Sequence, residues 1–213
     1  MPTVINPVNG QAIYSCAEWG AAPAAHAFDR TTPKVVVVHH MDWPNRPLIT
    51  DPAKALVRAC NVARSCQQQH MVGNGWADTG QNFTVTRDGI VLEGRHGSLM
   101  AALHGQSVRA AHAADPDTGA DANDSPGIEC EGTYSTATMP APQWAALLDL
   151  CAWLCHQDKI DSTWIIGHRD TGCRTECPGN WLESQLPALR AAVHNRLVKQ
   201  PAPKPQAPER DDV

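Results

Sequence analysis

The sequence predicts an α/β fold in which a central mixed β-sheet is flanked by helices. Short β-prone runs alternate with longer segments of helical periodicity along most of the 213 residues, a pattern typical of a sheet covered by helices. Two β-prone runs, 82–86 and 90–93, are separated by Arg87-Asp88-Gly89, and Asp-Gly between such runs is a strong hairpin signal. Because a hairpin pairs two strands in antiparallel fashion, we expect the sheet to be mixed rather than purely parallel.

The first third of the chain contains an arm, a strand and a helix. Residues 1–34 carry few strong signals, so we expect an N-terminal arm that crosses the domain in an extended conformation. Residues 35–38 are four consecutive valines, which fit a strand buried on both faces. Asp51-Pro52 combines an N-cap acid with a proline in the first turn, and helical spacing of apolar residues then continues to about His70.

The second half of the chain begins with residues 94–124, which have the composition of a long irregular loop with an Asp/Gly-rich end. Loops of this length inside a compact domain are usually functional. A final helix is predicted from about Asn180 to Val198, and we expect Pro187 to interrupt it. The remaining elements are expected at 127–131 (strand), 142–157 (helix with one apolar face) and 163–166 (strand).

Length and composition indicate one domain over residues 1–199, followed by a proline-rich segment at 200–213 that is typical of a disordered tail or linker. The net charge is −5 and no Lys/Arg cluster is present, so we expect no nucleic-acid partner. No apolar stretch approaches the roughly 18 residues of a membrane span. The first twenty residues lack a basic region followed by an apolar core, so we expect synthesis in the cytoplasm without a Sec signal.

The eight cysteines do not indicate disulfides by themselves. Two pairs each share one predicted helix, where their spacing disfavours disulfide geometry, and we expect these four thiols to act as small buried hydrophobic groups. The pairs are Cys60 with Cys66 and Cys151 with Cys155. The pairing of Cys16, Cys130 and Cys173 stays open; Cys173 lies in the same loop as Cys177 and could bind a metal or pair elsewhere.

Two histidines and a cysteine carry the strongest chemical signal. His39 and His168 each follow a β-prone run, and Cys177 follows His168 after a short loop. Strand ends are where α/β sheets display their chemistry, so one sheet edge could gather all three side chains. Because imidazole nitrogens and thiolates are zinc ligands, and three such ligands leave one position open, we predict a catalytic zinc ion and a hydrolase. His40 is the alternative to His39, since adjacent strand residues point to opposite faces.

Four blocks of the sequence resemble the zinc-dependent N-acetylmuramoyl-L-alanine amidases, the family that includes peptidoglycan recognition proteins and phage amidase endolysins. These blocks are 17–21, 35–40, 75–83 together with Arg87-Asp88-Gly89 and Glu93-Gly94-Arg95, and 167–179. The resemblance extends from about Ala17 to Leu189. It implies a peptidoglycan recognition protein-like amidase fold, a zinc cofactor, and peptidoglycan or a muropeptide as substrate.

The resemblance also implies a role for individual residues. His39, rather than His40, corresponds to the first zinc ligand, His168 to the second and Cys177 to the third. Glu129 matches an acidic residue beside the zinc, where a carboxylate can take a proton from water and return it to the leaving amine.

Other residues correspond to the substrate side of the family's site. Thr175 lies two residues before the cysteine ligand, where a hydroxyl can hydrogen-bond a developing oxyanion. His112 and Asn123 correspond to residues that contact the glycopeptide. Gln81 stands where many active relatives carry tyrosine; glutamine cannot act as an acid or base, although its amide can donate a hydrogen bond.

The predicted function is therefore hydrolysis of the amide bond between the lactyl group of N-acetylmuramic acid (MurNAc) and L-alanine. One alternative is a non-catalytic recognition module that binds peptidoglycan, which Gln81 favours. Another is a cysteine-type peptidoglycan peptidase that uses Cys177 with His168. The expected settings are an antibacterial phage endolysin, a delivered toxin with an immunity protein as partner, or a cytoplasmic recycling enzyme.

Overall fold

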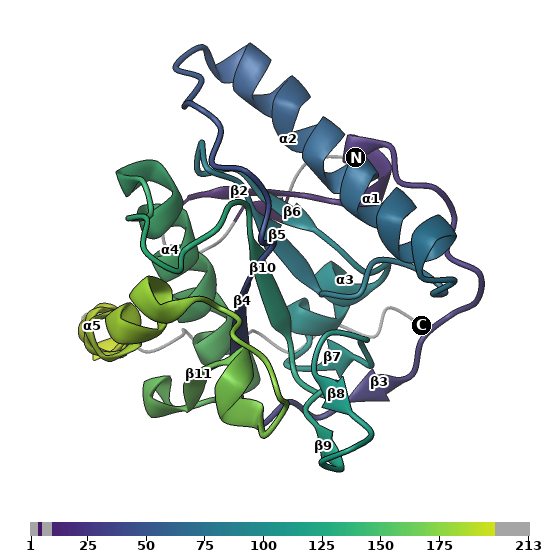
Figure 1. Ribbon diagram of the computed structural model, residues 1–213, viewed down its shortest axis with the longest axis vertical. Coiled ribbons are helices and arrows are strands. Elements are labelled where there is room, and N and C mark those ends of the chain that lie inside the picture. Colours follow the sequence, from purple (N-terminus) through teal and green to yellow (C-terminus); the bar gives the residue numbers. More distant parts are fainter. Residues whose placement is uncertain (1–3, 6–9, 199–213) are drawn as a thin grey trace, which may run out of the picture.

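The computed structural model describes residues 4–5 and 10–198, and its centre is a seven-stranded sheet (Figure 1). The strands, in spatial order, are β1 (Val4–Ile5), β2 (Ala12–Tyr14), β6 (Val91–Glu93), β5 (Phe83–Val85), β10 (Gly127–Cys130), β4 (Val36–His40) and β11 (Ile165–Gly167). β5 and β6 form the predicted antiparallel hairpin, whereas β5, β10, β4 and β11 are parallel neighbours. The predicted α/β fold with a mixed central sheet is confirmed.

Helices cover both faces of this sheet (Figure 1). One layer holds α1 (Cys16–Trp19) and α2 (Pro52–Gln68), which continues into the π-helical turn η1 (Gln69–Gly73). The opposite layer holds α4 (Ala141–Asp158) and α5 (Asn180–Val198), which pack against each other. The smaller elements are β3 (Arg30–Thr31), α3 (Ser98–Leu103), β7 (Ser107–Val108), β8 (Ala114–Asp115), β9 (Ala120–Asp121), η2 (Ser162–Trp164) and η3 (His168–Thr171).

The two faces of the sheet differ in chemistry because strand side chains alternate. Val36 and Val38 of β4 and Ile128 of β10 belong to the main apolar core with α4 and α5. Their neighbours in sequence, among them His39 and Glu129, therefore point to the α2 face. The α4 face is closed by apolar packing, and the α2 face carries the polar groups.

Helix α2 begins as predicted and is held by a second, smaller core. The Asp51 side chain accepts a hydrogen bond from the Lys54 N–H at 3.0 Å, which caps the first turn. Ala59 and Ala63 then pack against Trp19 of α1 and Leu92 of β6. Small side chains on this face let α2 lie close to the edge of the sheet, away from β10 and β4.

Helix α4 lies at the predicted place, but the expectation of a single apolar face is wrong. Residues 150–155 are all buried, and Trp144 is only partly buried. The reason is tertiary: α4 lies between the sheet and α5, so side chains on several sides of the helix are covered.

Three further expectations need correction. Residues 94–124 contain α3 and three short strands rather than one irregular loop, and residues 1–34 contribute β1 and β2 to the sheet edge. Strands this short depend on their pairing: β2 pairs with β6 and β3 with β7, both far away in the chain, whereas β8 and β9 form a local hairpin. Helix α5 runs through Pro187 without a break, because Leu186, Leu189 and other side chains on both sides of the proline are buried in the core.

The predicted tail at 200–213 lies outside the described residues. Within the described ranges, no helix has the length and apolar character needed to cross a membrane. All eight cysteines are free thiols. Cys66, Cys151 and Cys155 are buried, as expected for small hydrophobic groups, and Cys60 is half-buried.

Candidate metal centre and catalytic cleft

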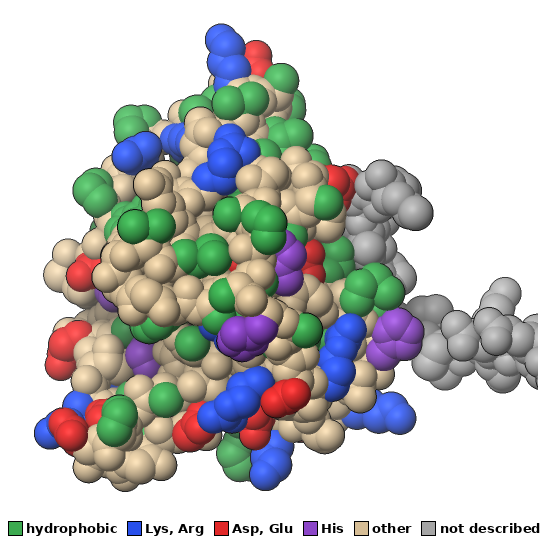
Figure 2. Space-filling view, turned by 90° about the vertical axis from the view of Figure 1, so that its right-hand side faces the viewer, with side chains coloured by type: hydrophobic (Ala, Val, Ile, Leu, Met, Phe, Trp, Pro, Cys, Tyr) green, Lys and Arg blue, Asp and Glu red, His purple; other side chains and the backbone are tan. Residues whose placement is uncertain are grey.

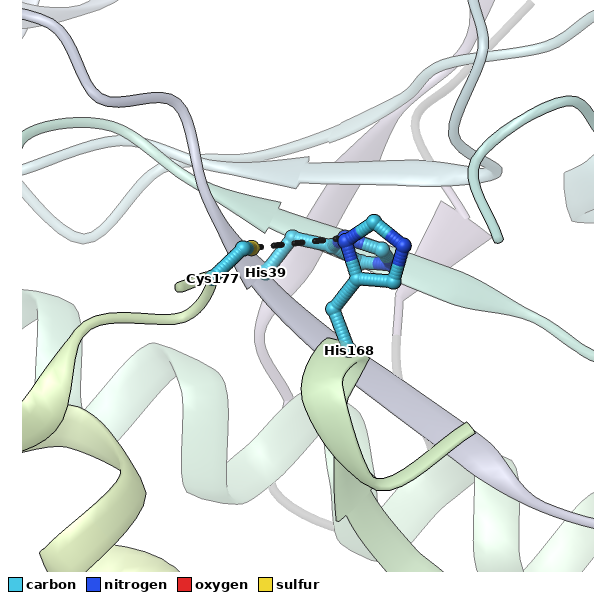
Figure 3. A group of neighbouring side chains, drawn as sticks. All are labelled: His39, His168 and Cys177. Atoms are coloured by element: carbon cyan, nitrogen blue, oxygen red, sulfur yellow. Dashed lines mark hydrogen bonds between the residues drawn. The ribbon is translucent and has the colours of Figure 1, made fainter. Parts of the chain in front are cut away.

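The three predicted ligands converge at one edge of the sheet (Figure 3). His39 lies near the end of β4, His168 opens η3 directly after β11, and Cys177 lies in the loop before α5. Because β11 pairs with β4 in parallel, both histidines are delivered to the same end of the sheet. One nitrogen of each imidazole and the Cys177 sulfur all lie within 4.8 Å of one another.

The loop that carries Cys177 is held by hydrogen bonds around the cysteine itself. The Arg169 backbone N–H donates to the Cys177 carbonyl at 3.1 Å, which ties this loop to the turn that follows His168. The Cys177 N–H donates to Thr175 Oγ1 at 3.1 Å, and the His40 N–H donates to the Cys177 sulfur at 3.4 Å. The position of the sulfur is therefore set by the backbone on both sides of it.

His112 fixes the protonation pattern of His39 through a chain of hydrogen bonds. His112 Nε2 lies 3.0 Å from the Ser125 carbonyl, which can only accept, so Nε2 carries the proton and Nδ1 has the free lone pair. His39 Nε2 lies 3.0 Å from this Nδ1 and must donate to it. The lone pair of His39 is therefore on Nδ1, the nitrogen 3.6 Å from the Cys177 sulfur (Figure 3). Such an outer partner is typical of metal-binding histidines.

The histidines of this cluster are held in the neutral form. Burial lowers the pKa of His39 well below its ordinary value, and the neighbouring His112 and His168 lower it further. Burial also lowers the pKa of His112, to about 4, and the pKa of His168. Neutral imidazoles have the free lone pair that a metal needs. Two such nitrogens and one sulfur are a donor set that fits zinc.

His40 takes a different part in the structure from His39. Its Nδ1 accepts a hydrogen bond from the Tyr134 N–H at 3.1 Å, on the side of the sheet opposite to His39. It therefore supports the loop after β10.

Glu129 lies beside the cluster and is the register partner of His39 across the β10–β4 pair. Partners in register point to the same face of a sheet, so its carboxyl group is directed to the same side as the His39 ring. Burial raises the pKa of Glu129 to about 8. Glu131 points to this face as well, but it lines a neighbouring hollow, and its Oε2 accepts from the Arg87 N–H at 2.9 Å.

A cleft of about 210 Å³ joins these groups to the end of α2. Besides the three ligands and Glu129, its walls include His112, Gln81, His70 and Trp76. Gln81 is fully buried, and its amide donates to Thr84 Oγ1 at 3.0 Å.

One residue of the cleft wall, His70, has a role that the sequence alone did not reveal. His70 was expected only as the helix end, yet its Nδ1 accepts from the Gly80 N–H at 3.0 Å and its ring lies 4.8 Å from that of Trp76. The available signal was its place one turn after Cys66. Asn123, which the resemblance placed in contact with the glycopeptide, is not among the cleft-lining residues; it is buried behind the cleft, where its Oδ1 accepts from the N–H groups of His112 and Ala113 at 2.7 and 2.8 Å.

Charged side chains near the cleft form ion pairs with one another and do not make a patch of a single sign. Arg109 pairs with Asp121 and Asp124, and Arg174 pairs with Asp115 and Asp117 on the β8–β9 hairpin. On the face shown in Figure 2, acidic and basic groups accordingly lie side by side. The Arg174 N–H also donates to Asp115 at 2.9 Å, which joins the hairpin to the loop of Cys177.

Residues 29–180, most of the chain, match the sequence model of a family described as N-acetylmuramoyl-L-alanine amidase. The chain belongs to this family. Among curated relatives, it is 32% identical over 180 residues to peptidoglycan-recognition protein SC2 of Drosophila simulans, covering 84% of this chain and 86% of that protein. It is 34% identical to an N-acetylmuramoyl-L-alanine amidase of Sus scrofa over 82% of this chain and 27% of that protein.

Solved structures of family members have the same fold. Wild-type Drosophila PGRP-LB superposes with a TM-score of 0.64 at 26% identity, covering 83% of this chain and 92% of that one. A PGRP-LB mutant in complex with tracheal cytotoxin gives 0.65 at 27% identity, covering 82% and 92%. The predicted family and its fold are thus confirmed. The relatives are named both as amidases and as recognition proteins. Whether this chain cleaves or only binds its ligand therefore has to be argued from the residues of its own cleft.

Proposed function

We propose that this family member is a zinc-dependent N-acetylmuramoyl-L-alanine amidase that hydrolyses the amide between the MurNAc lactyl group and L-alanine of peptidoglycan. The observation that carries the proposal is the convergence of His39, His168 and Cys177, with Glu129 in register beside His39. A binding module has no need of a buried carboxyl group next to three zinc-type ligands. The names of the pig and human amidase relatives support the same reading.

His39, His168 and Cys177 would hold the zinc ion, which when bound polarises the scissile carbonyl and activates water for attack. Glu129 takes a proton from the attacking water as the new C–O bond forms. It then gives this proton to the alanine nitrogen as the C–N bond breaks, leaving a lactyl carboxylate and a free amine. Because burial raises its pKa to about 8, Glu129 can hold that proton between the two steps near neutral pH.

In this proposal, Thr175 stabilises the oxyanion, and residues of the cleft wall bind the substrate. Thr175 Oγ1 already accepts from the Cys177 N–H, so its own hydroxyl proton is free to donate to the developing oxyanion. His112 and Gln81 line the cleft and contact the muropeptide. Asn123 acts from behind, by holding the backbone of His112.

The recognition module is the second candidate, and one observation favours it. Gln81 replaces a tyrosine of many active relatives, and it is fully buried with its amide already hydrogen-bonded. It therefore brings no acid or base to the cleft. The cysteine peptidase is disfavoured, because burial and the nearby Glu129 raise the pKa of the Cys177 thiol, whereas a nucleophilic cysteine needs a lowered one.

A digest of purified peptidoglycan, analysed by mass spectrometry with and without chelator, tests these candidates. We expect about one zinc per chain, release of free stem peptides with a new N-terminal alanine, and loss of release in chelator. Cys177→Ser should lose most of the zinc, and Cys173→Ser, in the same loop, is the matched control that should keep it. A zinc-loaded protein that retains muropeptide without cutting it would indicate the recognition module, and cleavage that survives chelation would indicate the cysteine peptidase.

The same chemistry suits several biological settings. We propose peptidoglycan or its fragments as the substrate whether the protein is released by a phage, delivered as a toxin or used in recycling. An immunity protein is expected as a partner in the delivered case alone.

A further inference from the structure

Arg169, directly after the ligand His168, is a charged residue whose side chain the proposed mechanism does not use. This side chain is only 25% exposed, whereas that of the nearby Arg174 is 65% exposed. A guanidinium that is largely removed from water lowers stability unless its N–H groups find acceptors. The place of Arg169 beside the metal centre therefore needs an explanation.

The donors of the Arg169 guanidinium are directed at the segment that carries Cys177. Nη1 donates to Asn180 Oδ1 at 2.9 Å, Nη2 donates to the Glu176 carbonyl, and Nε donates to the Cys177 carbonyl at 3.4 Å. The bonds thus reach the residue before the ligand, the ligand itself and the first residue of α5. A planar fork of several donors can make such a set of bonds, whereas a single ammonium group cannot.

Glu183, in the first turn of α5, lies against the same guanidinium. Its Oε2 is buried, accepts no hydrogen bond in the described part of the chain, and lies 3.8 Å from Arg169 Nε. A Cβ atom placed on Gly167 would overlap this oxygen and would lie 3.0 Å from Pro178 Cδ. The carboxylate therefore packs onto the backbone just before His168, where it balances the charge of Arg169.

The start of α5, to which Arg169 is bonded, is also fixed to the strand of the first ligand. The Trp181 N–H donates to the Tyr134 carbonyl at 3.0 Å, and the Tyr134 N–H donates to Nδ1 of His40 at 3.1 Å. His40 directly follows the first ligand on β4. Hydrogen bonds thus connect the segments of all three ligands, and the Arg169 side chain supplies bonds between the second segment and the third.

Two of the three ligands depend on such bonds because no long element holds them. His168 opens the four-residue turn η3, and Cys177 lies in the irregular loop between η3 and α5. Only His39 lies within a strand of the sheet. Ligands outside regular elements keep a productive geometry only when surrounding residues lock them, and a site that is ordered in advance binds with a smaller loss of entropy.

We propose that Arg169 is a positioning residue of the metal centre. Its guanidinium holds the His168 turn and the Cys177 loop at the separation that a zinc ion needs, and Glu183 keeps the guanidinium in place. This inference rests on the zinc site of the proposed function and involves no contact with the substrate. It assigns to Arg169 a role that lysine cannot fill, although lysine carries the same charge.

The first test is zinc affinity, measured by competition with a chromogenic chelator. Arg169→Lys should bind zinc about 10- to 100-fold more weakly, the usual effect of losing a residue that orients metal ligands. Glu183→Gln should lose at most about fivefold, because a partly exposed ion pair contributes little. Arg174→Lys is the matched control and should keep its affinity, since the Arg174 side chain pairs with the β8–β9 hairpin. Unchanged affinity in Arg169→Lys, or an equal loss in Arg174→Lys, would overturn the proposal.

Cobalt(II) in place of zinc separates positioning from a general loss of stability. The visible bands of cobalt depend on ligand geometry, and its charge-transfer band reports the bond to the Cys177 sulfur. At saturating cobalt, Arg169→Lys should show a weaker charge-transfer band than the wild type. Val193→Ala, a change in the core part of α5, should lower the melting temperature and leave the spectrum unchanged. A wild-type spectrum in Arg169→Lys would show that Arg169 does not position the ligands.

Hydrogen exchange of the metal-free proteins separates this proposal from the proposed function. The N–H groups of Arg169 and Gly179 are bonded to the Cys177 and Glu176 carbonyls at 3.1 and 2.8 Å. In Arg169→Lys they should exchange at least about tenfold faster than in the wild type or Arg174→Lys, the equivalent of one hydrogen bond to a charged group. If they do, but the wild type binds neither zinc nor cobalt, Arg169 positions the loop and the zinc site of the proposed function is wrong. If the wild type binds zinc and neither exchange nor affinity changes in Arg169→Lys, the role of Arg169 is wrong and the zinc site stands.

Discussion

Gly127→Ala should weaken metal binding although Gly127 touches no metal ligand. The backbone of Gly127 lies beneath the His112 ring, and an added Cβ would lie 2.5 Å from His112 Cδ2 and 2.7 Å from Nε2. Ordinary contact begins at 3.4 Å, so the ring must move by about 1 Å in a close-packed interior. A shift of this size breaks the 3.0 Å contacts of His112 with Ser125 and with His39.

The magnitude follows from what those contacts do. Loss of an outer partner of a metal-binding histidine typically costs about 10- to 100-fold in metal affinity. Overpacking of a filled site costs about 1–3 kcal/mol of folding stability. We therefore expect Gly127→Ala to stay folded with a lower melting temperature and to bind zinc about 10- to 100-fold more weakly.

Competition with a chromogenic chelator measures the zinc affinity, and thermal melts of the metal-free proteins measure the stability. The decisive comparison is a double-mutant cycle with His112→Ala. In that background the added methyl group has space, so Gly127→Ala should have little further effect on zinc affinity. Unchanged affinity in the single variant, or fully additive effects in the cycle, would refute the chain from Gly127 through His112 to His39.

Three further predictions concern other parts of the molecule. Glu129→Gln should retain zinc but lose about two to four orders of magnitude in peptide release, the usual worth of a general base; near wild-type turnover would move the base elsewhere. Gln81→Ala should cost about tenfold in kcat/KM if its amide only donates a hydrogen bond, whereas activity that appears only in Gln81→Tyr would favour the recognition module. Asp158, at the end of α4, has both carboxylate oxygens buried without a hydrogen-bond partner in the described part of the chain, and burial raises its pKa to about 7 from 3.8. The negative charge of Asp158 therefore lowers the folding stability as the pH rises from about 4 through 7. In urea unfolding at pH 8, Asp158→Asn should be more stable than the wild type by about 1–3 kcal/mol, with no such gain at pH 4. An equal gain at both pH values would contradict this assignment.

Local patterns in the sequence were sufficient to predict the main helices and strands and the residues of the candidate zinc site. Four consecutive valines predict a buried strand, Asp51-Pro52 predicts a helix start, and Asp88-Gly89 predicts a hairpin, because each depends on neighbours along the chain. The ligand histidines were found in the same way, since each follows a β-prone run. The choice of His39 over His40 came from the family resemblance.

Long-range partners decided what the sequence could not. Strand β7 forms only because the distant strand β3 pairs with it, and Pro187 is tolerated because the core holds α5 on both sides. Hydrophobic periodicity carries no information on such pairs.

The sequence by itself determined the fold class, the family and the identities of the residues that can bind zinc and move a proton, because these depend on residue type and local order. Only the tertiary structure decided how these residues act together. It placed His112 against His39, 73 residues away in the chain, and it set Glu129 in register beside the same histidine. It also formed a hollow between α2 and the loop 41–50, since cavities and hydrogen-bond chains arise from packing between segments that have no sequence relation to one another.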